Sequence, residues 1–304
     1  FALSGRKQVT ENIYRGEMVG REAELARWRE FIQPLERGEF AGVMVIRGEA
    51  GIGKSTLLKA VQDTCGDYFR SKDIVRVPVI AIAECSTPLA NQDIGEIEAL
   101  KPWIDLMEQL VLVTTREPEQ EKKDKKMKFD FGKFIIDTAP NWISLVPVLG
   151  PVVGAAAEIV TKSYDQLYLH KQFEKERPAA AAPLATIGSQ EQLFQQYINF
   201  LAKFSEVSPL VLIMDDFHWA DTSSSNLLFA AARQLLGKPI TFIVAYRPDD
   251  AHSSRDGAGH PILHIRNELG RYSMFSEISV PRMTALDLDA LLRSRYDNYV
   301  NNDE

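Results

Sequence analysis

The stretch at residues 46–57 reads IRGEAGIGKSTL and has the spacing G-x-x-x-x-G-K-[ST], with Gly48, Gly53, Lys54 and Ser55 at the fixed positions. Glycines let a backbone turn so tightly that successive N–H groups point at phosphate oxygens. A helix that starts directly after the turn adds the partial positive charge of its N-terminus. The pattern therefore predicts a phosphate-binding loop. A glycine-rich turn that precedes Lys-Ser by chance is the alternative.

Each side chain of this loop has an expected role toward a nucleoside triphosphate bound with Mg²⁺. Lys54 would contact the β- and γ-phosphates, Ser55 would bind Mg²⁺, and Thr56 would contact the α-phosphate. The backbone between the fixed positions would supply further N–H groups, from Glu49, Ala50, Gly51 and Ile52.

A second cluster of chemical interest follows the apolar run Val211–Met214, where Asp215 and Asp216 stand side by side. A carboxylate at the end of a buried strand can bind Mg²⁺ opposite Ser55, and we assign this role to Asp215. A neighbouring carboxylate can orient and deprotonate an attacking water, and we assign this role to Asp216. The alternative is an acidic turn after a strand, without catalytic function.

Arg247 is the third candidate, because it directly follows the apolar run TFIVAY at 241–246. A guanidinium held at this strand end can form a charge-assisted hydrogen bond to a terminal phosphate. A surface arginine before a proline turn is the alternative. Tyr246 is expected to pack in the core.

The elements that would position these residues alternate between strand and helix along the chain. Helical spacing of apolar residues begins near Ala23, and a helix is expected to follow the phosphate loop. Such alternation predicts an α/β fold, with a parallel sheet flanked by helices. The expected strands are 41–48, 73–85, 209–216, 239–247 and 275–280.

A long insertion separates the second expected strand from the third and contains two amphipathic helices, near 97–113 and 189–206. We expect five segments. They are an N-terminal extension (1–16), the first half of the nucleotide-binding core (17–86), a mainly helical insertion (87–205), the second half of the core (206–282) and the start of a helical lid (283–304).

Composition limits the class of protein. The chain has 304 residues, of which 45% are hydrophobic and 25% charged, as in an ordinary globular protein. The net charge of −7 argues against non-specific binding of nucleic acid. Cys65 and Cys85 are too few for a metal site and are expected to be buried thiols. The first residues lack the apolar core of a signal peptide, and we expect a cytoplasmic location.

The motifs MVGREAEL, GEAGIGKST, LIMDDFHWAD and IVAYRP occur in the order and spacing of STAND ATPases, the signal-transduction branch of AAA+-related P-loop proteins. The resemblance covers about 17–60 and 205–295. It implies a P-loop NTPase fold of the AAA+ kind, with ATP or ADP and Mg²⁺ as cofactors. It also implies that the chain is a piece of a longer regulator, whose lid and winged-helix region cannot be placed here.

The resemblance assigns further residues. The backbone around Met18 and Val19 would contact adenine, while Gly20 and Arg21 would shape that pocket. Three residues follow the acidic pair: His218 is expected to be packed or exposed rather than at the site, Trp219 to lie in the core, and Asp221 to cap a helix that begins near Thr222.

Two segments of the insertion invite other interpretations. The lysine-rich run at 121–128 is expected to be a solvated loop or helix face. The apolar run at 142–160 is interrupted by Pro147, Gly150, Pro151 and Gly154, so we expect a buried hairpin or a docking surface and consider a membrane span unlikely.

The function expected from these features is that of an ATP-hydrolysing regulatory switch, with slow turnover. Nucleotide state would control conformation or self-association, and protein partners would bind through the insertion or missing C-terminal regions. An ADP-locked scaffold without hydrolysis is one alternative. An AAA+ ATPase of DNA replication is another, which the acidic net charge disfavours.

Overall fold

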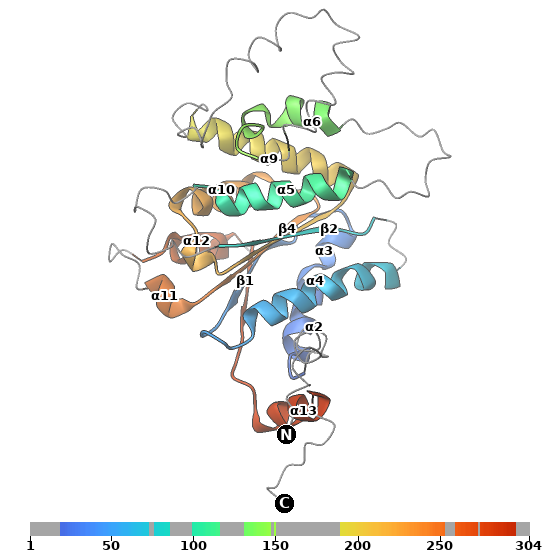
Figure 1. Ribbon diagram of the computed structural model, residues 1–304, viewed down its shortest axis with the longest axis vertical. Helices are drawn as coiled ribbons and strands as arrows, with labels where there is room; N and C mark the ends of the chain where they lie inside the picture. Colours follow the sequence, from blue (N-terminus) through green and yellow to red (C-terminus); the bar gives the residue numbers. More distant parts are fainter. Residues whose placement is uncertain are drawn as a thin grey trace, which may run out of the picture.

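A parallel β-sheet of five strands forms the centre of the molecule (Figure 1). The computed structural model describes residues 19–72, 76–85, 99–115, 131–146, 149, 189–252, 259–272 and 274–295. The strands are β1 (Gly42–Arg47), β2 (Val79–Glu84), β3 (Leu210–Asp215), β4 (Ile240–Tyr246) and β5 (Phe275–Ser279). They lie in the order β2-β3-β4-β1-β5, and every neighbouring pair is parallel. The expected α/β class with a parallel sheet is confirmed.

The carboxyl ends of the strands meet at one edge of this sheet. Arg47 of β1 lies opposite Tyr246 of β4, and Glu84 of β2 lies opposite Asp215 of β3. Since the strands are parallel and in register, the loops that follow them converge at the same edge, where open α/β sheets bind their ligands. The phosphate loop, the acidic pair and Arg247 all follow strands at this edge.

Side chains of the central strands alternate between two apolar cores. In β1, Val43 and Val45 point into one core, while Met44 and Ile46 point into the other. β3 and β4 alternate in the same way, and their residues are buried along nearly the whole strand. Strands covered on both faces read as continuous apolar runs, which is why the sequence revealed them.

One face of the sheet is covered by α2 (Glu22–Phe31), α3 (Gln33–Glu36) and α4 (Lys54–Ser71). Trp28 of α2 and Phe69 of α4 are among the largest side chains buried there. Cys65 is also buried in this core, where burial raises the pKa of its thiol to about 12. Cys85 is buried on the other face, and both cysteines are free thiols, as expected.

The opposite face is covered by α5 (Lys101–Thr115), α10 (Thr222–Gln234) and α12 (Pro261–Arg271). Beyond them lie α6 (Phe131–Thr138), a short 3₁₀ helix η1 (Pro140–Trp142) and α9 (Gln190–Val207), the upper layer in Figure 1. Trp103, Tyr197 and Trp142 join these layers through edge-to-face contacts, with ring centroids 5.1 and 4.5 Å apart. The described part of the insertion is therefore an integral layer of the fold.

Local sequence signals explain where several helices begin. Ser189 and Gln192 form a capping box at the start of α9. The carboxylate of Asp221 accepts a hydrogen bond of 2.9 Å from the Ser224 N–H, which confirms Asp221 as the cap of α10. His260 accepts from the Ile262 N–H and caps α12.

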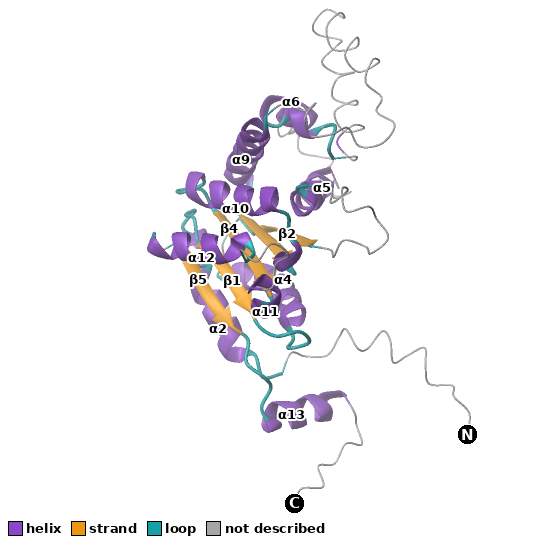
Figure 2. Cartoon of the chain, turned by 90° about the vertical axis from the view of Figure 1, so that its left-hand side faces the viewer, coloured by secondary structure: helices purple, strands orange, loops and turns teal. Residues whose placement is uncertain are grey.

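Three short elements follow the carboxyl ends of β3, β4 and β5. The 3₁₀ helix η3 (Phe217–Trp219) follows β3, and α11 (Pro248–His252) follows β4. The chain then leaves β5 for α13 (Ala285–Arg295), which lies apart from the sheet in Figures 1 and 2. Because η3 and α11 sit at the ligand-binding edge, they are placed to contribute side chains to a site there.

Some expectations need correction or lie outside the described residues. The second strand begins at Val79, later than the expected 73–85. Trp219 is half-buried and packs against the edge of the core. The lysine-rich run 121–128 and most of the apolar run 142–160 lie outside the described residues. Among the residues that are described, no helix combines the length and apolar character needed to cross a bilayer.

Candidate functional site

The phosphate loop connects β1 to α4, and its glycines have the conformations that the motif requires. Gly53 has φ +99° and ψ +23°, in the left-handed region that favours glycine. A Cβ on Gly48 would lie 2.8 Å from Cγ2 of Ile52, so a larger residue would push the loop open. A side chain at Gly48 or Gly53 would therefore disturb the backbone conformation of the loop.

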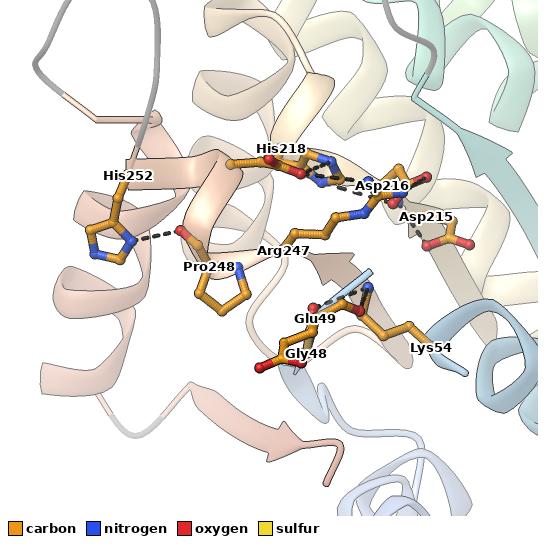
Figure 3. Close-up of polar contacts among 10 residues, drawn as sticks. Gly48, Glu49, Lys54, Asp215, Asp216, His218, Arg247, Pro248 and His252 are labelled. Carbon is orange, nitrogen blue, oxygen red and sulfur yellow. Dashed lines mark hydrogen bonds and ion pairs between the residues drawn. The ribbon is translucent and has the colours of Figure 1, made fainter. Parts of the chain in front are cut away.

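Lys54 begins α4 and folds back over this loop. Its Nζ donates to the carbonyl oxygens of Gly48 at 3.1 Å and Glu49 at 2.9 Å, and the residue is only 5% exposed (Figure 3). Burial lowers the pKa of the Lys54 ammonium, the charge of Arg247 lowers it further, and the carboxylates of Asp216 and Asp215 oppose this shift. The loop thus lies in one electrostatic cluster with the ends of β3 and β4.

Ser55 and Thr56 lie exposed in the first turn of α4, and Asp215 lies half-buried at the end of β3. The Asp215 Oδ1 accepts a hydrogen bond of 2.8 Å from the Asp216 N–H, which fixes the carboxylate at the strand end. A hydroxyl and a carboxylate are the oxygen ligands that suit Mg²⁺. The described residues hold no group of three or more His, Cys, Asp or Glu that would form an all-protein metal site. Two protein oxygens fit a Mg²⁺ whose other ligands are water and phosphate.

Asp216 adopts a conformation that is uncommon for a residue other than glycine. Its φ is +48° and its ψ is +40°, in the left-handed region, where Asp is more tolerated than most residues. This turn directs the chain from β3 into η3, and the Asp216 carboxylate lies 3.6 Å from Nη2 of Arg247. Backbone strain of this kind is often found at functional sites.

Arg247 follows β4 and lies between two carboxylates. In addition to the contact with Asp216, its Nη1 lies 3.6 Å from Oδ2 of Asp250, three residues further on in α11. The Nε of Arg247 is buried and has no hydrogen-bond partner within the described part of the chain. The guanidinium is therefore only loosely held in this arrangement.

His218 is fully buried beside the same two carboxylates. Its Nδ1 lies 3.9 Å from Oδ1 of Asp216 (Figure 3). Its Nε2 lies 3.3 Å from Oδ2 of Asp250. Burial is the main cause that lowers the pKa of His218, although both acids oppose it. His218 was expected to be packed or exposed, and it is buried. The expectation that it lies away from the site is wrong.

Arg21 joins the N-terminal segment of the site to the phosphate loop. It is 3% exposed, its Nη2 donates a hydrogen bond of 3.0 Å to the Ile52 carbonyl, and its Nη1 lies 3.4 Å from Oε1 of Glu24. Arg21 is therefore buried and is not a surface charge. Val19 and Gly20 are half-buried, and Met18 lies outside the described residues.

The segment that leaves β5 also contacts this region. Arg282 Nη2 donates a hydrogen bond of 2.7 Å to Oε2 of Glu49 in the phosphate loop. A Cβ on Gly20 would lie 2.6 Å from Cγ of Asp287, so α13 lies tightly against the segment assigned to adenine. A groove of about 350 Å³ runs along the loop between Glu49 and Arg282, and its lining does not include Lys54, Asp216 or Arg247.

Sequence reasoning missed Asp250. The signal was present, because Pro248 follows β4 and favours the first turn of a helix, which brings Arg247 and Asp250 together at a spacing of three residues. The sequence alone does not show that the chain after β3 passes close to α11. It therefore gave no reason to connect Asp250 with Asp216 or His218.

A family model for the AAA ATPase domain matches residues 17–243, well over half of the chain. The chain belongs to the AAA ATPase domain family. The match includes the phosphate loop and the acidic pair and ends four residues before Arg247. The five-stranded parallel sheet flanked by helices is accordingly a P-loop NTPase fold of the AAA+ kind.

Several solved structures resemble this AAA ATPase domain in fold. The ORC1 protein of Aeropyrum pernix in complex with DNA has 12% identity and a TM-score of 0.45, with 93% of this chain and 50% of that chain covered. The ORC2 protein of Aeropyrum pernix has 13% identity and a TM-score of 0.44, with 91% and 51% covered. The Drosophila ORC bound to DNA has 12% identity and a TM-score of 0.37, with 90% and 46% covered. The chain thus spans about half the length of these chains, and no curated protein matches it.

Proposed function

We propose that this AAA ATPase domain binds and slowly hydrolyses ATP, and that its nucleotide state switches the conformation or self-association of a larger signalling protein of the STAND kind. The observation that supports it best is the convergence of Lys54, Asp216 and Arg247. These three come from separate segments and form one charged cluster at the carboxyl edge of the sheet. Phosphate-binding cations and a group that positions or deprotonates the attacking water are the parts that hydrolysis of a phosphoanhydride uses.

Phosphate binding would rest on the loop and on Lys54. The backbone N–H groups from Gly48 to Thr56 surround the start of α4, whose dipole adds positive potential. The Lys54 ammonium, now bonded to two loop carbonyls, would exchange them for oxygens of the β- and γ-phosphates. Since an ammonium is attracted more strongly to a phosphate anion than to a neutral carbonyl, this exchange favours the bound state.

Ser55 and Asp215 would hold Mg²⁺. When bound, Mg²⁺ neutralises charge on the phosphate oxygens. The hydrogen bond from the Asp216 N–H fixes the orientation of the half-buried Asp215 carboxylate, which supports its role as a metal ligand.

Asp216 would act as the general base. It would take a proton from water as the water oxygen attacks the γ-phosphorus in line and the bond to the bridging oxygen of the β-phosphate breaks. Lys54 and Arg247 would stabilise the negative charge that develops on the phosphate oxygens. The products are ADP and inorganic phosphate.

The adenine base would lie along Met18, Val19 and Gly20. The bond from Arg21 to the Ile52 carbonyl supports this, since it ties that segment to the phosphate loop at a fixed distance. The contact between Gly20 and Asp287 further suggests that α13 lies close to the base. We place the protein in the cytoplasm, with protein partners or further copies as its binding partners.

Two alternatives from the sequence are tested by the same experiment. Purified protein is analysed for retained nucleotide, and phosphate release from ATP is then followed with and without Mg²⁺. Slow Mg²⁺-dependent release, together with a change in mass by light scattering between ATP and ADP, supports the proposal. Retained ADP without turnover would instead indicate the scaffold. Hydrolysis that rises on addition of duplex DNA would indicate a DNA-dependent ATPase.

A further inference from the structure

Four side chains at the edge of the sheet form a closed ring of alternating partners. Arg247 lies 3.6 Å from Asp216 and 3.6 Å from Asp250, and His218 lies 3.9 Å and 3.3 Å from the same two carboxylates. Asp216 and His218 follow β3, in the turn into η3 and in η3 itself, whereas Arg247 and Asp250 follow β4, so the tertiary fold brings the four together. The Arg247 guanidinium thus forms ion pairs with two carboxylates at once.

Neither ion pair holds Arg247 firmly. Both distances exceed those of charge-assisted hydrogen bonds, which are about 2.7–2.9 Å. The Arg247 side chain is 34% exposed and that of Asp250 42%, and partly exposed pairs of this kind contribute little to stability. A phosphate with two negative charges beside Lys54 would therefore compete with these carboxylates for the guanidinium.

Asp250 cannot follow Arg247 toward a phosphate. It lies in α11, a helix of five residues that starts at Pro248 and is anchored by the hydrogen bond from the Ala251 N–H to the Arg247 carbonyl. The backbone of Arg247 is thus fixed to the same turn, so a movement of the guanidinium does not carry the backbone of Asp250 with it. Movement of the guanidinium toward the phosphate loop lengthens the distance to Asp250.

We propose that Asp250 is a nucleotide-discriminating residue, which retains Arg247 when no terminal phosphate is present and lowers the affinity for ATP relative to ADP. The inference rests on the proposed function, and it assigns to that site a residue beyond the phosphate loop and the acidic pair. ATP must draw Arg247 away from Asp250, whereas ADP leaves the pair intact. An interaction shifts an equilibrium only by its difference between the two states, and this contact differs between ATP and ADP.

Asp249 provides a matched control. It is the neighbouring residue in the same short helix, it is exposed, and within the described ranges it has no ion pair. Replacing it with Asn removes the same charge at nearly the same place. A general effect of charge on nucleotide binding would therefore appear in both variants, and an effect through Arg247 only in Asp250→Asn.

The test measures by calorimetry the affinities for a non-hydrolysable ATP analogue and for ADP. The wild type is compared with four variants: Asp250→Asn, Asp249→Asn, Arg247→Ala and the double variant Arg247→Ala/Asp250→Asn. We expect Asp250→Asn to bind the analogue roughly fivefold more tightly, as the loss of one partly exposed ion pair predicts, with ADP unchanged. In the Arg247→Ala background the same substitution should have no effect. Asp250→Ala, with its fold checked by circular dichroism, should repeat the result.

Three results would overturn the inference. An unchanged ratio of the two affinities in Asp250→Asn would show that the pair does not discriminate. An equal gain in Asp249→Asn would show a general charge effect, and a gain that persists without Arg247 would show that Asp250 acts by a route other than Arg247, such as its charge near Lys54. If the wild type bound neither nucleotide, the proposed function itself would be wrong.

Discussion

The Nζ of Lys54 donates a hydrogen bond of 2.9 Å to the carbonyl oxygen of Glu49, a residue of the loop that precedes it. The side chain therefore turns back over its own loop instead of extending into solvent, and the residue is almost fully buried. A buried ammonium is costly without acceptors, and here backbone carbonyls provide them. The positive charge is thus held in place over the loop before any phosphate binds.

Replacing Lys54 with Ala should abolish tight binding of ATP. The loss of a charge-assisted contact to the phosphates is expected to weaken affinity about a hundredfold or more. Calorimetry with ATP and Mg²⁺ measures this, and Lys203→Ala, at an exposed position of α9, serves as the control. Unchanged affinity in Lys54→Ala would exclude the loop as the phosphate site.

Asp216→Asn should retain ATP but slow its hydrolysis by about a hundredfold or more, because an amide cannot accept the proton of the attacking water. Asp215→Asn should instead weaken the dependence of ATP binding on Mg²⁺. Titration of Mg²⁺ and single-turnover hydrolysis separate the two effects. Wild-type turnover by Asp216→Asn would contradict the base role.

Arg247→Ala should leave ADP affinity nearly unchanged and reduce the affinity for ATP or ATP-induced assembly. The guanidinium gains a strong acceptor only when the terminal phosphate is present. Both nucleotides are compared on the same variant, with light scattering for assembly. An equal loss for ADP would show that Arg247 acts on the structure of the site and not on the terminal phosphate.

The sequence was most informative where a residue's neighbours along the chain determine its environment. Apolar runs located β1 to β4, the alternating segment 275–280 located β5, and the glycine spacing located the turn between β1 and α4. The parallel order then follows from alternation of strands with helices. Lys54 could be assigned because its role depends on the loop directly before it.

The contacts that the sequence did not reveal are those made across the fold. Asp250 meets His218 only because α11 and η3 follow adjacent strands, a relationship set by the order of strands in the sheet. Arg282 reaches Glu49 across 233 residues of sequence. Patterns along the chain do not contain such pairings, so these residues remained unassigned until the fold was known.

Arg21 and Glu24 give a test of the link between the N-terminal segment and the loop. Both residues are buried, so Arg21→Ala leaves the Glu24 carboxylate without its partner. Removing one partner of a buried pair typically costs about 3 kcal/mol of unfolding free energy. Urea unfolding should show this loss. The double variant Arg21→Ala/Glu24→Gln should recover part of it, and no recovery would mean that the Ile52 bond dominates.

His260 should make the stability of the fold sensitive to mild acid. Its Nδ1 accepts a hydrogen bond of 3.2 Å from the Ile262 N–H, so its Nε2 carries the proton and donates to the Ala220 carbonyl at 3.0 Å. Burial lowers the pKa of His260 below the ordinary histidine value of 6.5, and the Ala220 bond and the charge of Asp221 oppose this only in part. A proton on Nδ1 would break the cap of α12. The folded protein therefore holds this imidazole neutral.

The sign of the pH effect follows from the two states. Well above pH 6.5, His260 is neutral in both the folded and the unfolded chain and does not affect the pH dependence of stability. Below that value the unfolded chain binds a proton that the folded chain excludes. The free energy of unfolding therefore decreases as the pH is lowered, until the pH reaches the lowered pKa of His260 in the folded state. The slope for this residue is at most about 1.4 kcal/mol per pH unit.

His260→Asn keeps a side-chain acceptor for the cap but removes the titrating group. Urea unfolding of the wild type and this variant at about pH 7.5 and about pH 5.5 gives the test, because contributions from other residues such as His218 cancel in the difference. We expect the variant to be less stable at the higher pH and to lose less stability on acidification. His264→Asn, at an exposed position of the same helix, should leave the pH dependence as it is. Parallel losses for the wild type and His260→Asn would mean that His260 is not the acid-sensitive group.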